Sequence, residues 1–263
     1  MTDSTTKAII LAAGTGSRLR PYTDDRTKVM VELFGQPILD YQLDVLKEHG
    51  IDDVTIVTGH APDSIPDGPY RKVHNERYAE SNMVESLFMA RDVLRAKGDV
   101  VVAYGDIVFE SVVLEAVLEK DAPITVAVDR KWHRYWSLRM DDPLDDAETL
   151  KLEQGDRIVE LGKTPSSPNE IEGQYTGLIR FREDLAQRLP DIYDQMDRDA
   201  TYDGEPFSNL YMTAFLQYLI DNGREVRAAF IENGWLEVDT CEDLELYHEL
   251  EKNGNLSSYF EAA

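Results

Sequence analysis

The sequence has one cysteine, Cys241, in 263 residues, and this scarcity excludes an internal disulfide framework. It also lacks long apolar runs, because charged residues or glycines interrupt each candidate within about ten residues, well short of a membrane-spanning helix. The start, MTDSTTK, has no apolar segment of the signal-peptide kind. We therefore expect a protein of a reducing cytoplasm that does not attach to a membrane.

Positive charge is scarce as well. The 27 lysines and arginines face 51 aspartates and glutamates, and the net charge is -24. Nucleic acids and anionic membranes require basic surfaces, so we expect neither as a partner. Acidic clusters such as DDPLDDAE, residues 141–148, are typical of solvated faces, and we interpret them so. The acidic excess fits a heavily hydrated surface, whose relation to a high-salt environment the sequence leaves open, and an anionic ligand would need locally placed cations.

Short β-rich runs alternate with helical patterns in the first half of the chain. Strands are expected at 7–13, 54–59, 71–75, 99–106 and 123–129, and helices at 37–50, 81–98 and 111–120. Such alternation predicts an α/β fold with a doubly wound, mostly parallel, Rossmann-like sheet. From residue 129 the pattern predicts a hairpin at 149–163, a strand at 175–181, a helix at 209–223, paired strands at 226–240 and a closing helix at 241–254.

The loop GTGSRLR follows the first expected strand. In an open parallel sheet, ligands bind beyond the carboxyl ends of the strands, and backbone N–H groups of this first loop can converge on phosphates. Both the dinucleotide fingerprint and the P-loop require glycine at position 19, where Leu19 stands. A Rossmann-type oxidoreductase and a P-loop enzyme are therefore disfavoured.

The stretch LAAGTGSRLRPYTDDRTKVMVELFGQPIL, residues 11–39, resembles the signature of nucleotidyltransferases that couple an NTP to a phosphorylated sugar or alcohol. The likeness continues at Gly105-Asp106, at Gly162-Lys163, at Gly177, and at WLEVDTCEDLELY, residues 235–247, so it spans nearly the whole chain. The family commonly has Pro-Lys-Pro around its lysine, whereas this chain has Thr27-Lys28-Val29.

The resemblance implies a reaction in which an acceptor phosphate oxygen attacks the α-phosphorus of an NTP and expels pyrophosphate. It implies catalytic roles for Arg18 and Lys28 at the NTP and for Lys163 at the acceptor phosphate, and Mg²⁺ as cofactor, held by Asp106 and Asp239. A helix or turn cap is the alternative for both aspartates, and a hairpin-edge lysine for Lys163. The expected nucleotide-binding residues are Leu11, Ala12, Ala13, Gly14, Thr15, Gly16, Ser17, Gly59, Asn82, Ser86 and Gly105.

The segment SNMVESLFMAR, with Asn82, Ser86 and Leu87, resembles cytidylyltransferases that activate phosphocholine and related small phosphoesters or phosphonates. We therefore expect CTP as donor and a small, phosphocholine-like phosphorylated acceptor. Aromatic side chains suit its ammonium group through cation–π attraction. The expected acceptor-binding residues are Trp132, Trp136, Tyr175, Gly177 and Trp235.

This resemblance implies one nucleotidyltransferase domain over residues 1–263. Its NTP-binding half covers about 1–128, its acceptor-binding half with a small β-rich lobe about 129–250, and a C-terminal tail 251–263. Two alternatives stay open: a sugar-1-phosphate nucleotidylyltransferase that makes an NDP-sugar, and a catalytically dead NTP-binding module. The oligomeric state is left open, with a homo-oligomer among the options.

Overall fold

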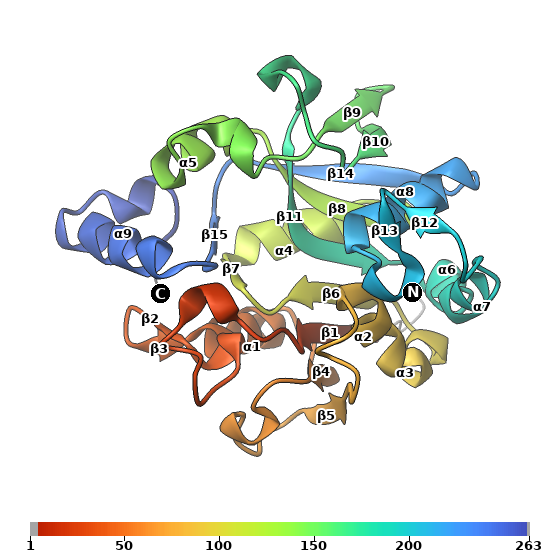
Figure 1. The fold of residues 1–263 in the computed structure, drawn as a ribbon, viewed down its shortest axis with the longest axis horizontal. Helices are drawn as coiled ribbons and strands as arrows, with labels where there is room; N and C mark the ends of the chain where they lie inside the picture. The colour runs from red at the N-terminus through yellow and green to blue at the C-terminus, as the bar shows by residue number, and fades with distance from the viewer. Residues whose placement is uncertain (1–4, 262–263) are drawn as a thin grey trace.

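A nine-stranded sheet forms the centre of the computed structural model, which describes residues 5–261 (Figure 1). Its strand order is β5-β4-β1-β6-β11-β8-β14-β10-β9. Only β11 and β10 among these strands run against the others, so seven of the nine point the same way. This confirms the predicted α/β fold with a mostly parallel sheet. The ends of the expected domain, residues 1–4 and 262–263, lie outside the described residues.

The large sheet consists of β1 (Lys7–Ala12), β4 (Val54–Thr58), β5 (Arg71–His74), β6 (Val100–Tyr104), β8 (Ile124–Asp129), β9 (Leu150–Glu153), β10 (Arg157–Leu161), β11 (Gln174–Phe181) and β14 (Val226–Ile231). Three short pairs accompany it: β2 (Glu32–Leu33) with β3 (Gln36–Pro37), β7 (Ile107–Phe109) with β15 (Trp235–Glu237), and β12 (Thr201–Tyr202) with β13 (Glu205–Pro206). The helices are α1 (Ile38–Glu48), α2 (Met83–Met89), α3 (Arg91–Arg95), α4 (Ser111–Glu119), α5 (Trp132–Arg139), α6 (Glu183–Ala186), α7 (Leu189–Asp194), α8 (Met212–Asp221) and α9 (Cys241–Lys252).

Two hydrophobic cores lie on the two faces of the sheet, because successive side chains of a strand point to opposite faces. In β1, Ala8, Ile10 and Ala12 belong to one core, while Ile9 and Leu11 belong to the other. The first core includes α1, α4, α5 and α9, and the second includes α2, α3, α6, α7 and α8. Figure 1 shows the second group of helices on the right of the sheet. Helices on both faces are the doubly wound arrangement that the sequence predicts.

The predicted hairpin at 149–163 is confirmed, since β9 and β10 pair antiparallel around residues 154–156. The paired strands predicted at 226–240 are wrong in their pairing. β14 pairs with β8 and β10 in the large sheet, whereas β15 pairs with β7. The chain leaves the large sheet after Ile231 through Asn233 and Gly234, which both have positive φ. This exit brings the end of β15 back to the strand that follows Asp106.

The helix predicted at 81–98 begins later and is divided into α2 and α3 at Ala90. Its N-cap is Asn82, whose side chain accepts a hydrogen bond from the N–H of Met83, and not Ser81. Ser81 is engaged elsewhere, because its hydroxyl accepts from the amide of Asn75 and donates to the carbonyl of Arg77. The aromatic segment near residue 132, for which the sequence predicts no element, forms α5.

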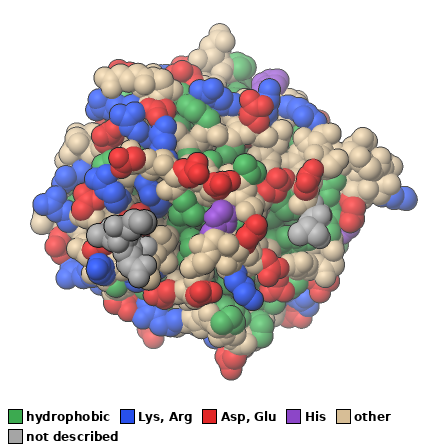
Figure 2. All heavy atoms as spheres, turned by 180° about the vertical axis from the view of Figure 1, so that it is seen from behind, with side chains coloured by type: hydrophobic (Ala, Val, Ile, Leu, Met, Phe, Trp, Pro, Cys, Tyr) green, Lys and Arg blue, Asp and Glu red, His purple; other side chains and the backbone are tan. Residues whose placement is uncertain are grey.

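The face opposite to that of Figure 1 carries acidic side chains scattered among basic ones (Figure 2). This distribution fits the hydrated surface expected from the net charge of -24. Among the described residues, helices of the length and apolarity needed to cross a bilayer are absent.

Candidate functional site

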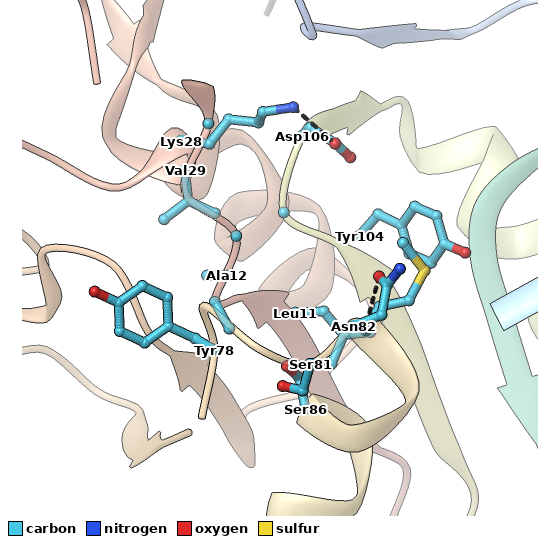
Figure 3. Close-up of a pocket in the computed structure, with 15 residues that line it drawn as sticks. Leu11, Ala12, Lys28, Val29, Tyr78, Ser81, Asn82, Ser86, Tyr104 and Asp106 are labelled. Carbon is cyan, nitrogen blue, oxygen red and sulfur yellow. Dashed lines mark hydrogen bonds and ion pairs between the residues drawn. The ribbon is translucent and has the colours of Figure 1, made fainter. Parts of the chain in front are cut away.

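A cavity of about 170 Å³ lies beyond the carboxyl ends of β1 and β6, where an open sheet of this kind binds ligands (Figure 3). It brings together segments that are far apart in the sequence: the loop after β1, the turn after β6, and the start of α2. Its lining residues are Leu11, Ala12, Ala13, Gly14, Gly16, Lys28, Val29, Tyr78, Ser81, Asn82, Met83, Ser86, Tyr104, Gly105 and Asp106. We call it the nucleotide cavity.

Eight of the eleven predicted nucleotide-binding residues line this cavity, and the other three, Thr15, Ser17 and Gly59, flank lining residues in the chain or in space. A side chain at Gly59 would collide with the carbonyl of Ala13 and with Tyr78. In Figure 3, Ser81, Asn82 and Ser86 approach the cavity from the side of α2, opposite Lys28 and Asp106.

The loop after β1 leaves backbone donors available for an anion. Two backbone hydrogen bonds engage the carbonyl groups of this loop: the N–H of His60 donates to the carbonyl of Ala13, and the N–H of Leu19 donates to the carbonyl of Gly16. Within residues 5–261, the N–H groups of Gly14 through Ser17 have no protein acceptor. Gly16 has φ of 60°, in the left-handed region, which the turn into Ser17 requires. Converging backbone donors of this kind bind phosphate oxygens.

Lys28 is held in place by its two neighbours. The hydroxyl of Thr27 donates to the carbonyl of Ala12 at 3.0 Å, and Val29 is fully buried against the turn at Gly105. Gly105 cannot carry a side chain, because a Cβ there would lie 2.6 Å from the carbonyl of Leu11 and 2.7 Å from Val29. Thr27 and Val29 thus fix the lysine from both sides along the chain.

Four charged groups meet at one edge of the nucleotide cavity. The ammonium of Lys28 lies 3.1 Å from Asp106 Oδ2 and 2.6 Å from Asp239 Oδ1, and Arg18 Nη2 lies 2.5 Å from Asp239 Oδ2. Burial alone would lower the pKa of Lys28, but the two carboxylates outweigh it and raise this pKa above its ordinary value. Lys28 therefore stays charged near neutral pH. Arg18 is 65% exposed and covers the site from outside.

The carboxylates of Asp106 and Asp239 are not caps. Thr240 and Asp243 form the capping box at the start of α9, so Asp239 is left to face Lys28 and Arg18. Asp106 Oδ1 is buried and, within the described chain, has no hydrogen-bond partner. An unpaired buried carboxylate oxygen beside a second carboxylate fits Mg²⁺, which proteins hold through one or two carboxylates and the phosphates of the substrate.

A second cavity, of about 150 Å³, adjoins the first and shares Met83 and Tyr104 with it. It is lined by Met83, Tyr104, Trp136, Asp146, Glu148, Gln174, Tyr175, Thr176, Gly177, Tyr211, Met212, Thr213, Trp235 and Glu237. We call it the acceptor cavity. Gly177 has φ of 84°, and a Cβ there would lie 2.7 Å from the ring of Tyr104, so a glycine is needed at the boundary between the two cavities.

Arg139 connects the acceptor cavity to the aspartates. Its side chain is 1% exposed, and its guanidinium binds Glu237 Oε2 at 2.6 Å and both carboxylate oxygens of Asp243. Asp243 in turn accepts the N–H of Asp239 at 3.0 Å. Burial raises the pKa of Glu237 to about 7, with Asp106 and Asp239 adding to the rise and Arg139 opposing it.

Four of the five predicted acceptor-binding residues, Trp136, Tyr175, Gly177 and Trp235, line the acceptor cavity. Trp132 does not, within the part of the chain described here. It lies one turn before Trp136 on α5, about 6 Å along the helix axis, and is buried in the core that contains α9. Lys163 is 55% exposed and its ammonium pairs with Glu160 at 2.6 Å, so in this structure it points to the hairpin surface and away from both linings.

The sequence interpretation missed most of the polar lining of the acceptor cavity. The cluster at 141–148, interpreted as a solvated face, places Glu148 half-buried in this lining, so that interpretation is wrong for Glu148, whereas Asp146 borders the cavity and stays exposed to solvent. The hairpin that follows them carries the segment back to the sheet, where an isolated bridge joins Leu150 to Ile171. A signal was available for Glu237, which lies two residues before Asp239, and for Tyr104, which directly precedes Gly105-Asp106.

Comparison with known proteins also indicates a nucleotidyltransferase. Residues 8–197 match the model of the MobA-like NTP transferase domain. A curated relative, CTP:phosphoglutamine cytidylyltransferase of Campylobacter jejuni, is 39% identical over 248 residues, which cover 91% of this chain and 98% of the relative. Choline-phosphate cytidylyltransferase of Streptococcus pneumoniae is 39% identical over 92 residues, which cover 34% of this chain and 40% of that relative.

The fold is also found among solved structures. The inositol-1-phosphate CTP transferase from T. maritima superposes with a TM-score of 0.70 at 19% identity, and the match covers all of both chains. At this identity the likeness concerns the fold alone.

Proposed function

Because the chain belongs to the MobA-like NTP transferase family and is a nucleotidyltransferase, we propose that it is a magnesium-dependent cytidylyltransferase acting on a small phosphorylated acceptor. In the proposed reaction, an acceptor phosphate oxygen attacks the α-phosphorus of CTP. The bond from this phosphorus to the oxygen bridging the α- and β-phosphates breaks, and pyrophosphate leaves. The products are a CMP-linked acceptor and pyrophosphate.

One observation carries the proposal: Lys28 lies between two carboxylates at the edge of the nucleotide cavity, next to the acceptor cavity. The attacking phosphate is already ionised near neutral pH, since its second pKa is about 6, and needs no strong general base. Positioning and charge neutralisation are then the main requirements. A lysine held at the edge of the nucleotide cavity, within reach of a bound α-phosphate, meets both requirements.

The chain's own groups divide this work. The N–H groups of residues 14–17 hold the triphosphate, and Arg18 neutralises the charge of the departing pyrophosphate. Lys28 moves from the carboxylates to the α-phosphate, where negative charge shifts in the transition state. Asp106 and Asp239 would hold Mg²⁺, which supplies Lewis-acid neutralisation of the triphosphate when it is bound.

The choice of CTP is supported by the relatives whose names include CTP or a cytidylyl group, one of which matches almost the full length of both chains. A small acceptor that carries a positively charged amine, the class to which phosphocholine and its relatives belong, is supported by the acidic lining of the second cavity. In this proposal, Lys163 swings from Glu160 to the acceptor phosphate, which the flexible stem of an exposed lysine permits.

Pyrophosphate release tests this function. The purified protein is incubated with Mg²⁺, each of the four common NTPs, and phosphocholine, phosphoethanolamine, 2-aminoethylphosphonate, phosphoglutamine or glucose 1-phosphate. We expect release that requires both CTP and an amine-bearing acceptor. A preference for glucose 1-phosphate would instead indicate a sugar-1-phosphate nucleotidylyltransferase, and the absence of release with every pair would indicate an NTP-binding module without catalysis.

A further inference from the structure

The acceptor cavity has an unusual charge. Asp146, Glu148 and Glu237 line it, and of the residues in this lining none is a lysine or an arginine. Arg139 contacts Glu237, but its guanidinium is buried and already bound to both oxygens of Asp243. It therefore cannot meet a ligand in the cavity. A site with three carboxylates and no available cation favours a ligand that brings its own positive charge.

Glu148 differs from the other two carboxylates, because Asp146 is exposed to solvent and Glu237 is paired with Arg139, whereas Glu148 is half-buried and, among the described residues, has no basic partner. Its carboxylate accepts a hydrogen bond from the hydroxyl of Thr213 at 3.4 Å, and at this distance the bond is weak. Burial raises the pKa of Glu148 to about 7, and the nearby carboxylates of Asp146, Asp203 and Glu237 add to this rise. A half-buried carboxylate beside like charges, with one weak donor, has room for further donors, and a bound ammonium group supplies them.

The two tryptophans of the cavity are placed to pack rather than to surround a cation. Trp136 and Trp235 are 3% and 2% exposed, and their ring centroids lie 5.9 Å apart. Tyr135 covers both rings in edge-on contacts with centroids 5.4 and 5.3 Å away. These contacts leave little ring face for a quaternary ammonium. The carboxylate oxygens, which accept directional hydrogen bonds, are the better recognition groups.

We infer, on the basis of the proposed function, that the acceptor carries an amine with N–H bonds and that Glu148 is the residue that selects it. Glu148 accepts hydrogen bonds from the protonated amine, and Glu237 across the cavity adds attraction from the other side. A quaternary ammonium of the same charge has no N–H to donate and loses these bonds. Glu148 acts on the affinity for the acceptor and not on the phosphates of CTP.

A graded set of acceptors tests the inference through the kcat/KM of pyrophosphate release with CTP. Phosphoethanolamine is compared with its mono-, di- and trimethylated forms, the last being phosphocholine, and with ethyl phosphate, which lacks the amine. Phosphoglutamine and its Nα-acetyl derivative form a second matched pair, on a different scaffold. We expect a stepwise fall with methylation, and a loss of about tenfold or more, mainly through KM, when the charged donor is absent.

Glu148→Gln is the matched variant. It should lower the kcat/KM for amine-bearing acceptors by about tenfold and leave ethyl phosphate, and the KM for CTP, nearly unchanged. Glu153→Gln, an exposed position at the end of β9, is the control and should change neither. If the variant folds poorly, the acceptor series measured with the wild-type protein still tests the N–H requirement.

The outcomes separate the two levels of the argument. If phosphocholine equals or exceeds phosphoethanolamine, or if acetylated phosphoglutamine equals the free amine, the N–H requirement is overturned while the cytidylyltransferase activity stands. If Glu148→Gln lowers the kcat/KM equally for all acceptors, the assignment of Glu148 to the amine is overturned. If CTP yields pyrophosphate with none of these acceptors, the proposed function itself fails.

Discussion

The two cavities are built in different ways. The nucleotide cavity presents backbone and small residues of the loop after β1 on one side and side chains from the start of α2 on another, with Lys28 and Asp106 at its edge. The acceptor cavity is formed by side chains from β6, α5, β11, α8 and β15, and carries three carboxylates. Every NTP presents the same triphosphate, so one loop of backbone donors serves it. An acceptor is recognised by side chains, which can differ between relatives without altering the fold.

The comparison predicts its largest effect where the cavities meet. Asp106→Asn or Asp239→Asn removes a carboxylate that faces Lys28, and should lower turnover at least about a hundredfold, a range typical of losing one electrostatic stabiliser. This fall is measured as the steady-state turnover of each variant at saturating Mg²⁺. Asp52→Asn, exposed at the opposite end of β4, is the control. Near-normal turnover in either site variant would show that its aspartate does not hold the metal.

The two lysines should divide between the cavities. Lys28→Ala should lower kcat by about tenfold to a hundredfold and weaken CTP binding less, because its charge acts where negative charge moves in the transition state. Lys163→Ala should mainly raise the KM for the acceptor. Titration calorimetry with CTP and initial rates for both substrates separate the effects. If both variants change both substrates equally, the division between donor and acceptor is wrong.

Trp136→Ala tests the acceptor cavity without touching the nucleotide cavity. It should raise the KM for an amine-bearing acceptor by about five- to thirty-fold, because the indole forms part of the wall of the acceptor cavity, and leave the KM for CTP nearly unchanged. Because Trp136 is buried against Trp235 and Tyr135, the melting temperature should fall as well. Kinetics are therefore measured well below that temperature. A shared loss for CTP and acceptor would show that the indole only supports the fold.

The smallest effect concerns stability and pH. The pKa of Glu148 is about 7 in the folded protein and near 4.5 when unfolded, so its charged form destabilises the fold above pH 7. This penalty disappears as the pH falls through 7 towards 4.5. Glu148→Gln should therefore melt a few degrees higher than the wild type at pH 8 and equally at pH 4. A lower melting temperature at pH 8 would show that the carboxylate stabilises the protein.

The same comparison explains what the sequence could predict. The sheet, its crossover helices and the loop at 11–18 follow from local patterns and from a short signature, because backbone phosphate binding demands glycines at fixed spacing. Glu148 lies in an acidic run that is indistinguishable from a solvated face until β9 folds back beside β10. Its role depends on contacts with Thr213, 65 residues away in the chain, and such contacts leave no local pattern.

The pairing of β15 with β7 illustrates the same limit at the level of the fold. Both halves of the segment 226–240 have strand composition, and local pattern predicts that they pair with each other. The positive φ of Asn233 and Gly234 instead redirects the chain, so that Asp239 arrives beside Lys28. The sequence signature predicted that Asp106 and Asp239 act together, whereas the course of the chain that brings them together is seen only in the structure.

The central claim is that an oxygen of the acceptor phosphate attacks the α-phosphorus of CTP, and isotope labelling tests it most directly. Phosphoethanolamine with ¹⁸O in its three non-bridging phosphate oxygens is incubated with the protein, CTP and Mg²⁺, and the products are analysed by mass spectrometry. The account predicts that all three labelled oxygens remain in a CMP-linked product and that pyrophosphate is unlabelled. Label in pyrophosphate or in free CMP, or a product linked through the amine, would contradict it.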